Sequence, residues 1–232
     1  MITRHSLMVA AIWLVTNPMV AMMPTNRIME TGPQKVELPA PALNSSTSIE
    51  EALQERRSIR QYRNAPLTLK EISQLLWAAQ GITEEHTGFR TAPSAGALYP
   101  LEVYMVINQG DELPVGVWHY LPEEHHIEQI KDENIRKGLQ EAALGQSHIG
   151  NAPAVMVITG VYERTTRKYG DRGVRYVYME AGHAAQNVYL QAVSLELGTV
   201  VIGAFHNGDV RTVLNLSAEE EPLYLMPVGQ KK

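Results

Sequence analysis

The segment Arg90-Thr-Ala-Pro-Ser-Ala-Gly-Ala-Leu-Tyr-Pro100 has no helical or strand periodicity of its own. Pro93 and Pro100 fix the backbone φ angle at two points and remove two donors, while Gly96 allows another group to approach closely. Leu101–Ile107 then continues as a strand. A constrained loop that leads directly into a strand suits backbone contacts with a flat or anionic ligand. The alternative is a Pro/Gly turn that only reverses the chain.

A basic segment, Glu55-Arg-Arg-Ser-Ile-Arg-Gln-Tyr62, precedes this loop and places three arginines and a serine close together. Arg56 and Arg60 share one face if the helix before them continues through the segment. Forked guanidinium groups beside a hydroxyl bind phosphate well. The alternative is a solvated basic helix end that offsets the helix dipole.

Together the two segments resemble the signature of the nitroreductase-like flavoprotein family, in which Arg-Arg-Ser-x-Arg is followed by a Pro-Ser loop. Here they read Arg56-Arg-Ser-Ile-Arg60 and Pro93-Ser-Ala-Gly96, and the resemblance continues to the C-terminus through Thr199–Phe205 and Pro222–Gly229. Ala97 stands where the wider family often has asparagine. The sequence Ser-Ala-Gly-Ala-Leu-Tyr-Pro resembles that of the azoline dehydrogenase branch, which oxidises peptide thiazolines and oxazolines.

The resemblance implies a site for FMN. In this arrangement Arg56 would bind the phosphate, with Arg57 beside it, and Ser58 would bind the phosphate or the ribityl chain. Arg60 would lie at the N1/O2 edge of the ring, where a positive group favours the reduced cofactor. The loop residues Pro93, Ser94, Ala95, Gly96 and Ala97 would border the ring, with contributions from both subunits of a homodimer.

Two further matches follow from the resemblance. Backbone N–H groups of Gly203 and Ala204 occupy the place that reaches flavin N5 in the family. A basic residue near the C-terminus binds phosphate in the family, and Lys231 or Lys232 corresponds to it.

The charged run from Arg164 to Arg175 has two interpretations. It is either a solvated helix entrance or part of the active site. Lys168 and Tyr169 resemble the Lys-Tyr pair of azoline dehydrogenases, in which the lysine removes a ring proton while a hydride goes to flavin N5. Neighbouring arginines would favour the uncharged lysine that such a base requires.

Composition excludes several classes of site. The chain has 232 residues, of which 44% are hydrophobic, and this is enough for one domain with a sizeable core. A net charge of −5 gives no general attraction to nucleic acid. The absence of cysteine excludes disulfides, thiolate metal sites and cysteine nucleophiles. The eight histidines are scattered and predict no metal site.

The beginning of the chain predicts a leader. A short basic start and the apolar run Ser6–Val15 make residues 1–23 a signal peptide or an N-terminal anchor, with a soluble amphipathic start as a third reading. Residues 24–47 contain four prolines and read as a linker. The flavoprotein-like domain then spans residues 48–232. We therefore expect export to the periplasm or the medium, while a cytoplasmic location stays open.

Periodicity predicts an α+β fold, with a central, mostly antiparallel sheet packed by helices. The predicted helices start at Ser48 or span 71–80, 134–144, 174–197 and 207–214; the strands span 101–107, 116–121, 126–130, 154–159, 199–205 and 223–228. The long helix 174–197 is apolar on two sides, so we expect it to be buried within the domain or between two subunits.

Three functions are consistent with these patterns. The leading one is an FMN-dependent oxidoreductase that takes hydride from NAD(P)H and passes it to an electrophilic small molecule in ping-pong fashion. The second is an azoline dehydrogenase that acts on a modified peptide. The third is a scaffold protein that binds a flavin or a peptide without catalysis.

Overall fold

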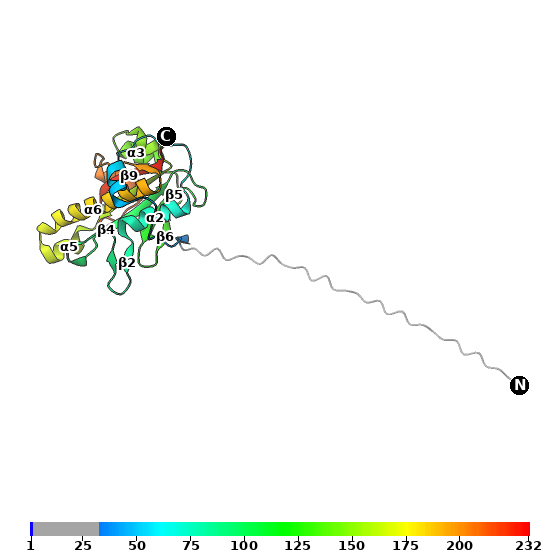
Figure 1. Cartoon of the computed structure of the whole chain (residues 1–232), viewed down its shortest axis with the longest axis horizontal. Coiled ribbons are helices and arrows are strands. Elements are labelled where there is room, and N and C mark those ends of the chain that lie inside the picture. Colours follow the sequence, from blue (N-terminus) through cyan, green and yellow to red (C-terminus); the bar gives the residue numbers. More distant parts are fainter. Residues whose placement is uncertain (2–32) are drawn as a thin grey trace. The chain divides into compact units, whose positions relative to one another are not determined.

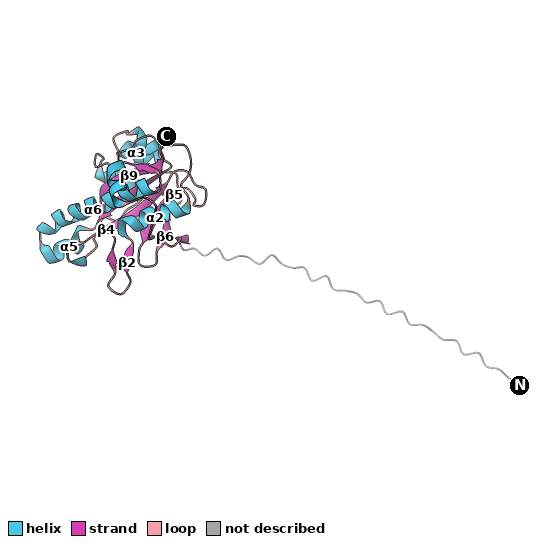
Figure 2. Cartoon of the chain, viewed as in Figure 1, coloured by secondary structure: helices cyan, strands magenta, loops and turns pink. Residues whose placement is uncertain are grey.

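A seven-stranded sheet forms the centre of the described part of the chain, which is Met1 and residues 33–232 of the computed structural model (Figure 2). The strands lie in the order β1-β6-β5-β4-β7-β9-β8, and each neighbouring pair is antiparallel. They are β1 (Lys35–Glu37), β4 (Leu101–Ile107), β5 (Gly116–Leu121), β6 (His126–Lys131), β7 (Ala154–Gly160), β8 (Leu197–Thr199) and β9 (Glu221–Gln230). A separate hairpin of β2 (Ile82–Glu84) and β3 (Phe89–Arg90) projects from the body (Figure 1). The predicted α+β class is confirmed.

Helices cover both faces of this sheet. They are α1 (Ile49–Glu55), α2 (Leu69–Gln80), α3 (Arg136–Ala142), α4 (Ser147–Asn151), α5 (Tyr162–Tyr169), α6 (Arg172–Ser194) and α7 (Asn207–Leu214), with a single 3₁₀ turn, η1 (Ala95–Ala97). The side chains of α2 and α6 share one hydrophobic core with the sheet, and those of α3, α4 and α7 share a second. α5 and the first turns of α6 extend beyond the sheet (Figure 1).

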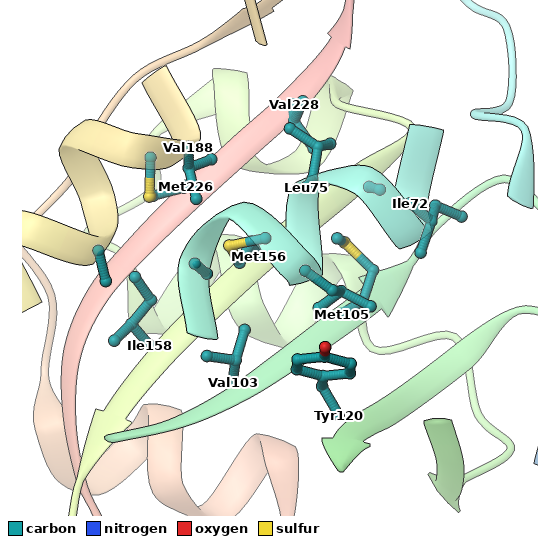
Figure 3. Close-up of a cluster of buried hydrophobic side chains, with 14 of the residues drawn as sticks. Ile72, Leu75, Val103, Met105, Tyr120, Met156, Ile158, Val188, Met226 and Val228 are labelled. Carbon is teal, nitrogen blue, oxygen red and sulfur yellow. The ribbon is translucent and has the colours of Figure 1, made fainter. Parts of the chain in front are cut away.

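Alternation along the central strands produces these two cores. Val103 and Met105 of β4 face α2 and α6, whereas Tyr104 and Val106 face the other layer. Figure 3 shows the first core, in which Met105, Met156 and Met226 come from three adjacent strands. Every residue of β7 is buried, as the continuous apolar run predicts for a strand covered on both faces.

Helix ends follow their capping residues. The side chain of Thr68 accepts from the Glu71 N–H, and the Glu71 carboxylate accepts from the Thr68 N–H, so the predicted capping box of α2 is confirmed. At α1 the Ser48 hydroxyl accepts from the Glu51 N–H. Gly81 ends α2, and its N–H donates to the Trp77 carbonyl.

The predicted strand 199–205 is wrong. β8 ends at Thr199, and beyond it only Ile202 pairs with β9, through Leu225. The Val201 N–H donates to the Tyr189 hydroxyl, which draws the backbone out of the ladder. Helix 174–197 is displaced as well, because α6 starts at Arg172 and ends at Ser194. Gly198 lies within β8, where the side chain of Ile59 packs against it.

Part of the predicted linker 24–47 lies within the compact unit. From residue 33 the chain belongs to the compact unit, β1 pairs with β6, and Leu38 is buried in the first core. The predicted leader 1–23 and the first part of the linker lie outside the described residues, apart from Met1. Within the described part of the chain, none of the helices has both the length and the hydropathy that a membrane span needs.

Candidate functional site

The basic segment lies against the edge of the sheet. α1 ends at Glu55, and Arg56 has an extended ψ of 120°, so the helix does not continue and Arg56 and Arg60 do not share a helical face. The segment instead runs alongside β8. Ser58 pairs with Thr199, and the Ile59 N–H donates to the Thr199 carbonyl at 2.9 Å. This pairing holds the backbone of residues 58–59 in place beside the sheet.

Tyr189 of α6 organises the polar side chains here. Its hydroxyl lies 3.0 Å from Ser58 Oγ and accepts from the Val201 N–H at 2.9 Å. Because that N–H fills one lone pair, the tyrosine proton is free to point at Ser58. The Arg56 guanidinium lies 5.1 Å from the centre of the Tyr189 ring, as a cation–π contact requires. The sequence reading placed Tyr189 only on an apolar helix side and missed this role.

The other two arginines differ from each other. Arg57 Nη1 donates to the carbonyls of Gln54 and Arg56, both at 2.8 Å, so this side chain turns back onto the end of its own helix. The predicted cofactor role of Arg57 therefore has no support in its geometry. Arg60 is exposed. Burial lowers the pKa of the His148 ring, and the positive charge of Arg60 lowers it further.

The C-terminal end of the chain lies beside this segment. The backbone of Lys231 pairs with that of Tyr62, and the Arg63 N–H donates to the Gln230 carbonyl at 2.9 Å. Lys231 is exposed, and its backbone partner, Tyr62, is two residues beyond Arg60 in the chain. The fold thus places the segment 56–60 and Lys231 along the same edge of the sheet.

Gly203 and Ala204 follow the bridge between Ile202 and Leu225 and are exposed. The Ala204 carbonyl accepts from Gln146 Nε2 at 2.8 Å. A Cβ atom on Gly203 would have no described atom within 4 Å. The backbone of this pair is therefore open to a ligand, as its predicted role requires.

The loop Pro93–Ala97 has an unusual backbone. Gly96, Ala97 and Tyr99 all have positive φ angles, of 65°, 53° and 44°. Positive φ costs free energy in residues that carry a Cβ, so other contacts must hold this shape. One such contact is the Tyr99 N–H, which donates to Ser94 Oγ at 2.9 Å. A second is Asn187 of α6, whose side chain donates to the Thr91 carbonyl at 3.2 Å.

Lys168 and Tyr169 meet this loop at its glycine. A Cβ atom on Gly96 would lie 2.7 Å from the Tyr169 hydroxyl and 2.9 Å from Lys168 Nζ. Lys168 Nζ also lies 5.5 Å from the centre of the Tyr169 ring. Lys168 is exposed, as the solvated-helix interpretation of the charged run expects, yet the fold brings the pair to the predicted ring-binding loop. A Cβ atom at position 96 would force the ends of both side chains to shift, and the φ angle of 65° also favours glycine there.

A buried acid lies beneath the same loop. Glu180 of α6 is 2% exposed, and burial raises the pKa of its carboxyl to about 7, against the opposing effects of the Ser94 hydroxyl and the Arg90 charge. Arg90 itself donates to Gln80 and Glu123 and lies 4.6 Å from the centre of the Tyr99 ring. The sequence reading did not select Glu180 or Arg90.

A hollow of about 650 Å³ lies elsewhere, between α1, α2, α6 and the segment 39–48. None of the predicted cofactor residues lines it. Its walls include the largely exposed side chains of Leu43 and Ile49. We associate this hollow with an uncovered apolar face of the chain and place the chemistry at the basic segment and the loop.

Comparison with known proteins identifies the fold family. The family model described as "Nitroreductase family" matches residues 53–230, which include every predicted site residue except Lys231 and its alternative, Lys232. The chain belongs to the nitroreductase family. The family and the similar nitroreductase sequence place it among the oxidoreductases.

Similar proteins cover most of this nitroreductase-family chain. A protein of Methanocaldococcus jannaschii named as a nitroreductase is 53% identical over 183 residues, which are 79% of this chain and 91% of that protein. A crystal structure from Ralstonia eutropha, also named as a nitroreductase, has a TM-score of 0.76 and 29% identity, and the match covers 85% of this chain and 90% of that one.

A third similar structure is a chain of an Escherichia coli microcin synthetase complex with a truncated microcin precursor bound. It has a TM-score of 0.67 and 25% identity, and the match covers 92% of this chain and 84% of that one. This relative acts in a complex that holds a peptide, which makes it relevant to the choice of substrate below.

The donor set of this nitroreductase-family chain fits a flavin phosphate. Arg56, Arg60 and Lys231 have no acidic partner among the described residues, so their charges are available to an anion. The Ser58 hydroxyl lies on the same tyrosine, Tyr189, that the Arg56 guanidinium contacts. Within one chain, the residues around Gly96 lie apart from this donor set. Glu180, which lies beneath the loop, and Tyr189, which contacts Arg56 and Ser58, are nine residues apart on α6, or about 13 Å along the helix axis. No group of described residues has the composition of a metal site.

Proposed function

We propose that this chain is an FMN-dependent oxidoreductase. The observation that carries the proposal is the contact of Tyr189 with both Arg56 and Ser58, because it fixes a cation and a hydroxyl at one end of the sheet. Such a pair suits a phosphate monoester, which accepts charge-assisted hydrogen bonds. Arg60 and Lys231 add positive charge beside it.

Bound FMN would supply hydride transfer, with NAD(P)H as donor and an electrophilic small molecule as acceptor. The chain's own residues bind and orient. Arg56 and Ser58 hold the phosphate end, Arg60 places positive charge near the ring, and the exposed backbone of Gly203 and Ala204 offers hydrogen bonds to its edge. Pro93–Ala97 provides a flat, small-residue wall.

The complete site requires a homodimer in this proposal. Among the described residues, large exposed apolar side chains gather on α1, the segment before it and α6; they are Leu43, Ile49, Leu53, Tyr178 and Met179. α1 packs against α6, and in this proposal the exposed sides of these two helices belong to the surface that a second copy covers. A second copy on that face would bury them and bring another subunit's loop to the phosphate-binding segment.

The test is reconstitution of the purified protein with FMN, followed by absorbance spectroscopy and light scattering. We expect a yellow, dimeric protein that is bleached by NADH or NADPH under anaerobic conditions. Protein that stays colourless after reconstitution contradicts the cofactor. A stable, folded monomer at micromolar concentration contradicts the dimer.

The second candidate is azoline oxidation, and the position of Lys168 favours it. A generic reductase needs no protein base, yet Lys168 and Tyr169 lie at the tip of the ring-binding loop. Lys168 would take one proton from the azoline ring as a hydride leaves the ring for the flavin, and dioxygen would then remove the two electrons. The similarity to a chain of a microcin synthetase complex supports a modified peptide as substrate.

One comparison separates the candidates. The FMN-loaded protein is mixed either with NADPH and a nitroaromatic acceptor or with a thiazoline-containing peptide and dioxygen. Turnover of the first pair alone supports the reductase, and formation of thiazole supports the second candidate. FMN binding without turnover of either would indicate the scaffold function.

A further inference from the structure

The helix α5, which carries Lys168 and Tyr169, buries few of its side chains. It extends beyond the sheet together with the first turns of α6 (Figure 1). All eight of its residues are described, and of these Thr165 alone is buried. Polar contacts must therefore contribute to the position of Lys168 and Tyr169 beside Gly96.

Arg164 supplies such contacts from the first turn of α5. Its Nη1 donates to the Tyr99 carbonyl at 3.1 Å, and its Nη2 forms an ion pair with Glu102 Oε1. Tyr99 lies at the end of the loop and has a φ of 44°, whereas Glu102 lies on β4. A guanidinium is a planar fork of donors, so it can bind both oxygens at once in one fixed orientation.

Glu102 is a well-fixed partner for this guanidinium. Its side chain is 17% exposed, and its Oε2 lies 2.8 Å from Nε2 of His119 on β5. The His119 ring in turn stacks on Tyr104 of β4, with 4.6 Å between the ring centres. The carboxylate is thus bound through both oxygens, one to α5 and one to β5, so it anchors the Arg164 side chain to the sheet.

The spacing along α5 connects this anchor to the tip of the loop. Arg164 and Lys168 are four residues apart, so they share one face of the helix and lie about 6 Å apart along its axis. The arginine binds the Tyr99 carbonyl, and the lysine lies beside Gly96. α5 and the loop therefore meet at two points on one helix face, about one turn apart.

We propose that Arg164 is a positioning residue that acts through the end of α5. It binds the Tyr99 carbonyl, with Glu102 as its anchor. This contact holds Lys168 against the loop at Gly96. The inference rests on the proposed function in that the loop would border the flavin ring and Lys168 would be the base of the second candidate, whereas the contact itself is made by residues of this chain alone.

The experiment is an NMR measurement on the full chain without added cofactor, labelled selectively at glycine and tyrosine. A Cβ atom on Gly96 would lie 3.5 Å from Tyr169 Cε2, so the wild type should show a nuclear Overhauser effect between the Gly96 α-protons and the Tyr169 ring. Arg164→Ala removes the contact with the Tyr99 carbonyl, and we expect the Overhauser effect to disappear in this variant.

A second variant keeps the proposal testable where Arg164→Ala does not fold. Glu102→Gln keeps the shape of the side chain but loses its charge, and a neutral hydrogen bond is about half as strong as a charge-assisted one. The Overhauser effect should therefore be weaker than in the wild type. Arg167→Ala is the matched control, because Arg167 pairs with Glu163 on the same helix, and it should keep the wild-type intensity. Wild-type intensity in every folded variant of Arg164 and Glu102 overturns the proposal.

Kinetics separate positioning from a general loss of stability. If the FMN-loaded wild type oxidises a thiazoline-containing peptide, Arg164→Ala should lower kcat about 10²-fold, the cost of misplacing a catalytic group by about 1 Å, with KM for the peptide unchanged. A variant that is only less stable keeps its kcat per folded molecule. Equal kcat in Arg164→Ala and Arg167→Ala contradicts the positioning role.

Flavin fluorescence separates this inference from the cofactor. If the wild type binds no FMN, the proposed function fails, while the Overhauser effect still decides the role of Arg164. If FMN binds and the Overhauser effect depends on Arg164, both stand.

Discussion

The hydroxyls of Ser58 and Tyr189 lie 3.0 Å apart, although the two residues are 131 positions apart in the chain. The same tyrosine hydroxyl accepts from the Val201 N–H and its ring faces the Arg56 guanidinium. One residue of α6 therefore joins the basic segment to the backbone beyond β8. This contact brings together the residues of the proposed phosphate site, which come from separate parts of the sequence.

Removing the Tyr189 hydroxyl should destabilise the contact between the basic segment and the backbone beyond β8. In Tyr189→Phe the Val201 N–H and the Ser58 hydroxyl both lose a partner, and we expect the free energy of unfolding to fall by about 1–2 kcal/mol. Urea denaturation measures this change. Tyr178→Phe is the matched control, since its hydroxyl contacts only the exposed Tyr162 hydroxyl. Equal losses in both variants would show that Tyr189 has no special role.

Two adjacent arginines should differ in their effect on FMN. Arg56 faces Tyr189 and has no acidic partner among the described residues, so Arg56→Ala should weaken FMN binding by roughly 1.5–3 kcal/mol, the size of a charge-assisted bond. Arg57 donates to carbonyls of its own helix end, so Arg57→Ala should weaken binding by less than about 0.5 kcal/mol. Flavin fluorescence titration gives both values, and the reverse order would contradict the site.

Much of the fold could be predicted because local sequence patterns coincide with it. Alternation at Val103 and Met105, the apolar run of β7 and the capping box at Thr68 are short-range signals, and each element forms where they indicate. The end of α1 at Glu55 was not predictable in this way. It depends on the pairing of Ser58 with Thr199, which is a contact between distant segments.

The site was predictable in part for the same reason. The arginines, the loop and the Lys-Tyr pair are recognisable as residue types at fixed spacing, and the fold brings Lys168 and Tyr169 to Gly96. Glu180 was missed, although a signal was present. It falls on the helical stripe of Val177 and Ala184, so a carboxyl there has to be buried. Tyr189 gave no such signal, because tyrosine is common on an apolar helix side.

The stability of the protein should depend on pH through Glu180. Its pKa is raised from 4.5 in the unfolded chain to about 7 in the fold, so the native state binds the proton more tightly. The resulting stabilisation is fully present below about pH 4.5 and is lost as the pH rises through about 7. Glu180→Gln carries no charge at any pH, so relative to the wild type it should gain about 3 kcal/mol between about pH 4.5 and about pH 8.

Urea unfolding of both proteins across that pH range tests this expectation. Glu85→Gln, which removes an exposed carboxyl from the hairpin between β2 and β3, is the control and should follow the wild type. A constant difference between Glu180→Gln and the wild type at every pH would mean that the buried carboxyl does not titrate in this range.

Lys168 distinguishes the two enzymatic functions. Its Nζ lies at the Gly96 tip of the loop, where a base for azoline oxidation would have to be, whereas hydride transfer from a nicotinamide needs no protein base. Lys168→Ala should therefore leave FMN binding and reduction by NADPH unchanged, while azoline oxidation falls by about 10²–10⁴-fold, as expected for loss of a general base. Arg167→Ala is the matched control, because Arg167 is paired with Glu163 on the exposed side of α5. If Lys168→Ala and Arg167→Ala oxidise the azoline at equal rates, the charged run is a solvated helix surface and the base lies elsewhere.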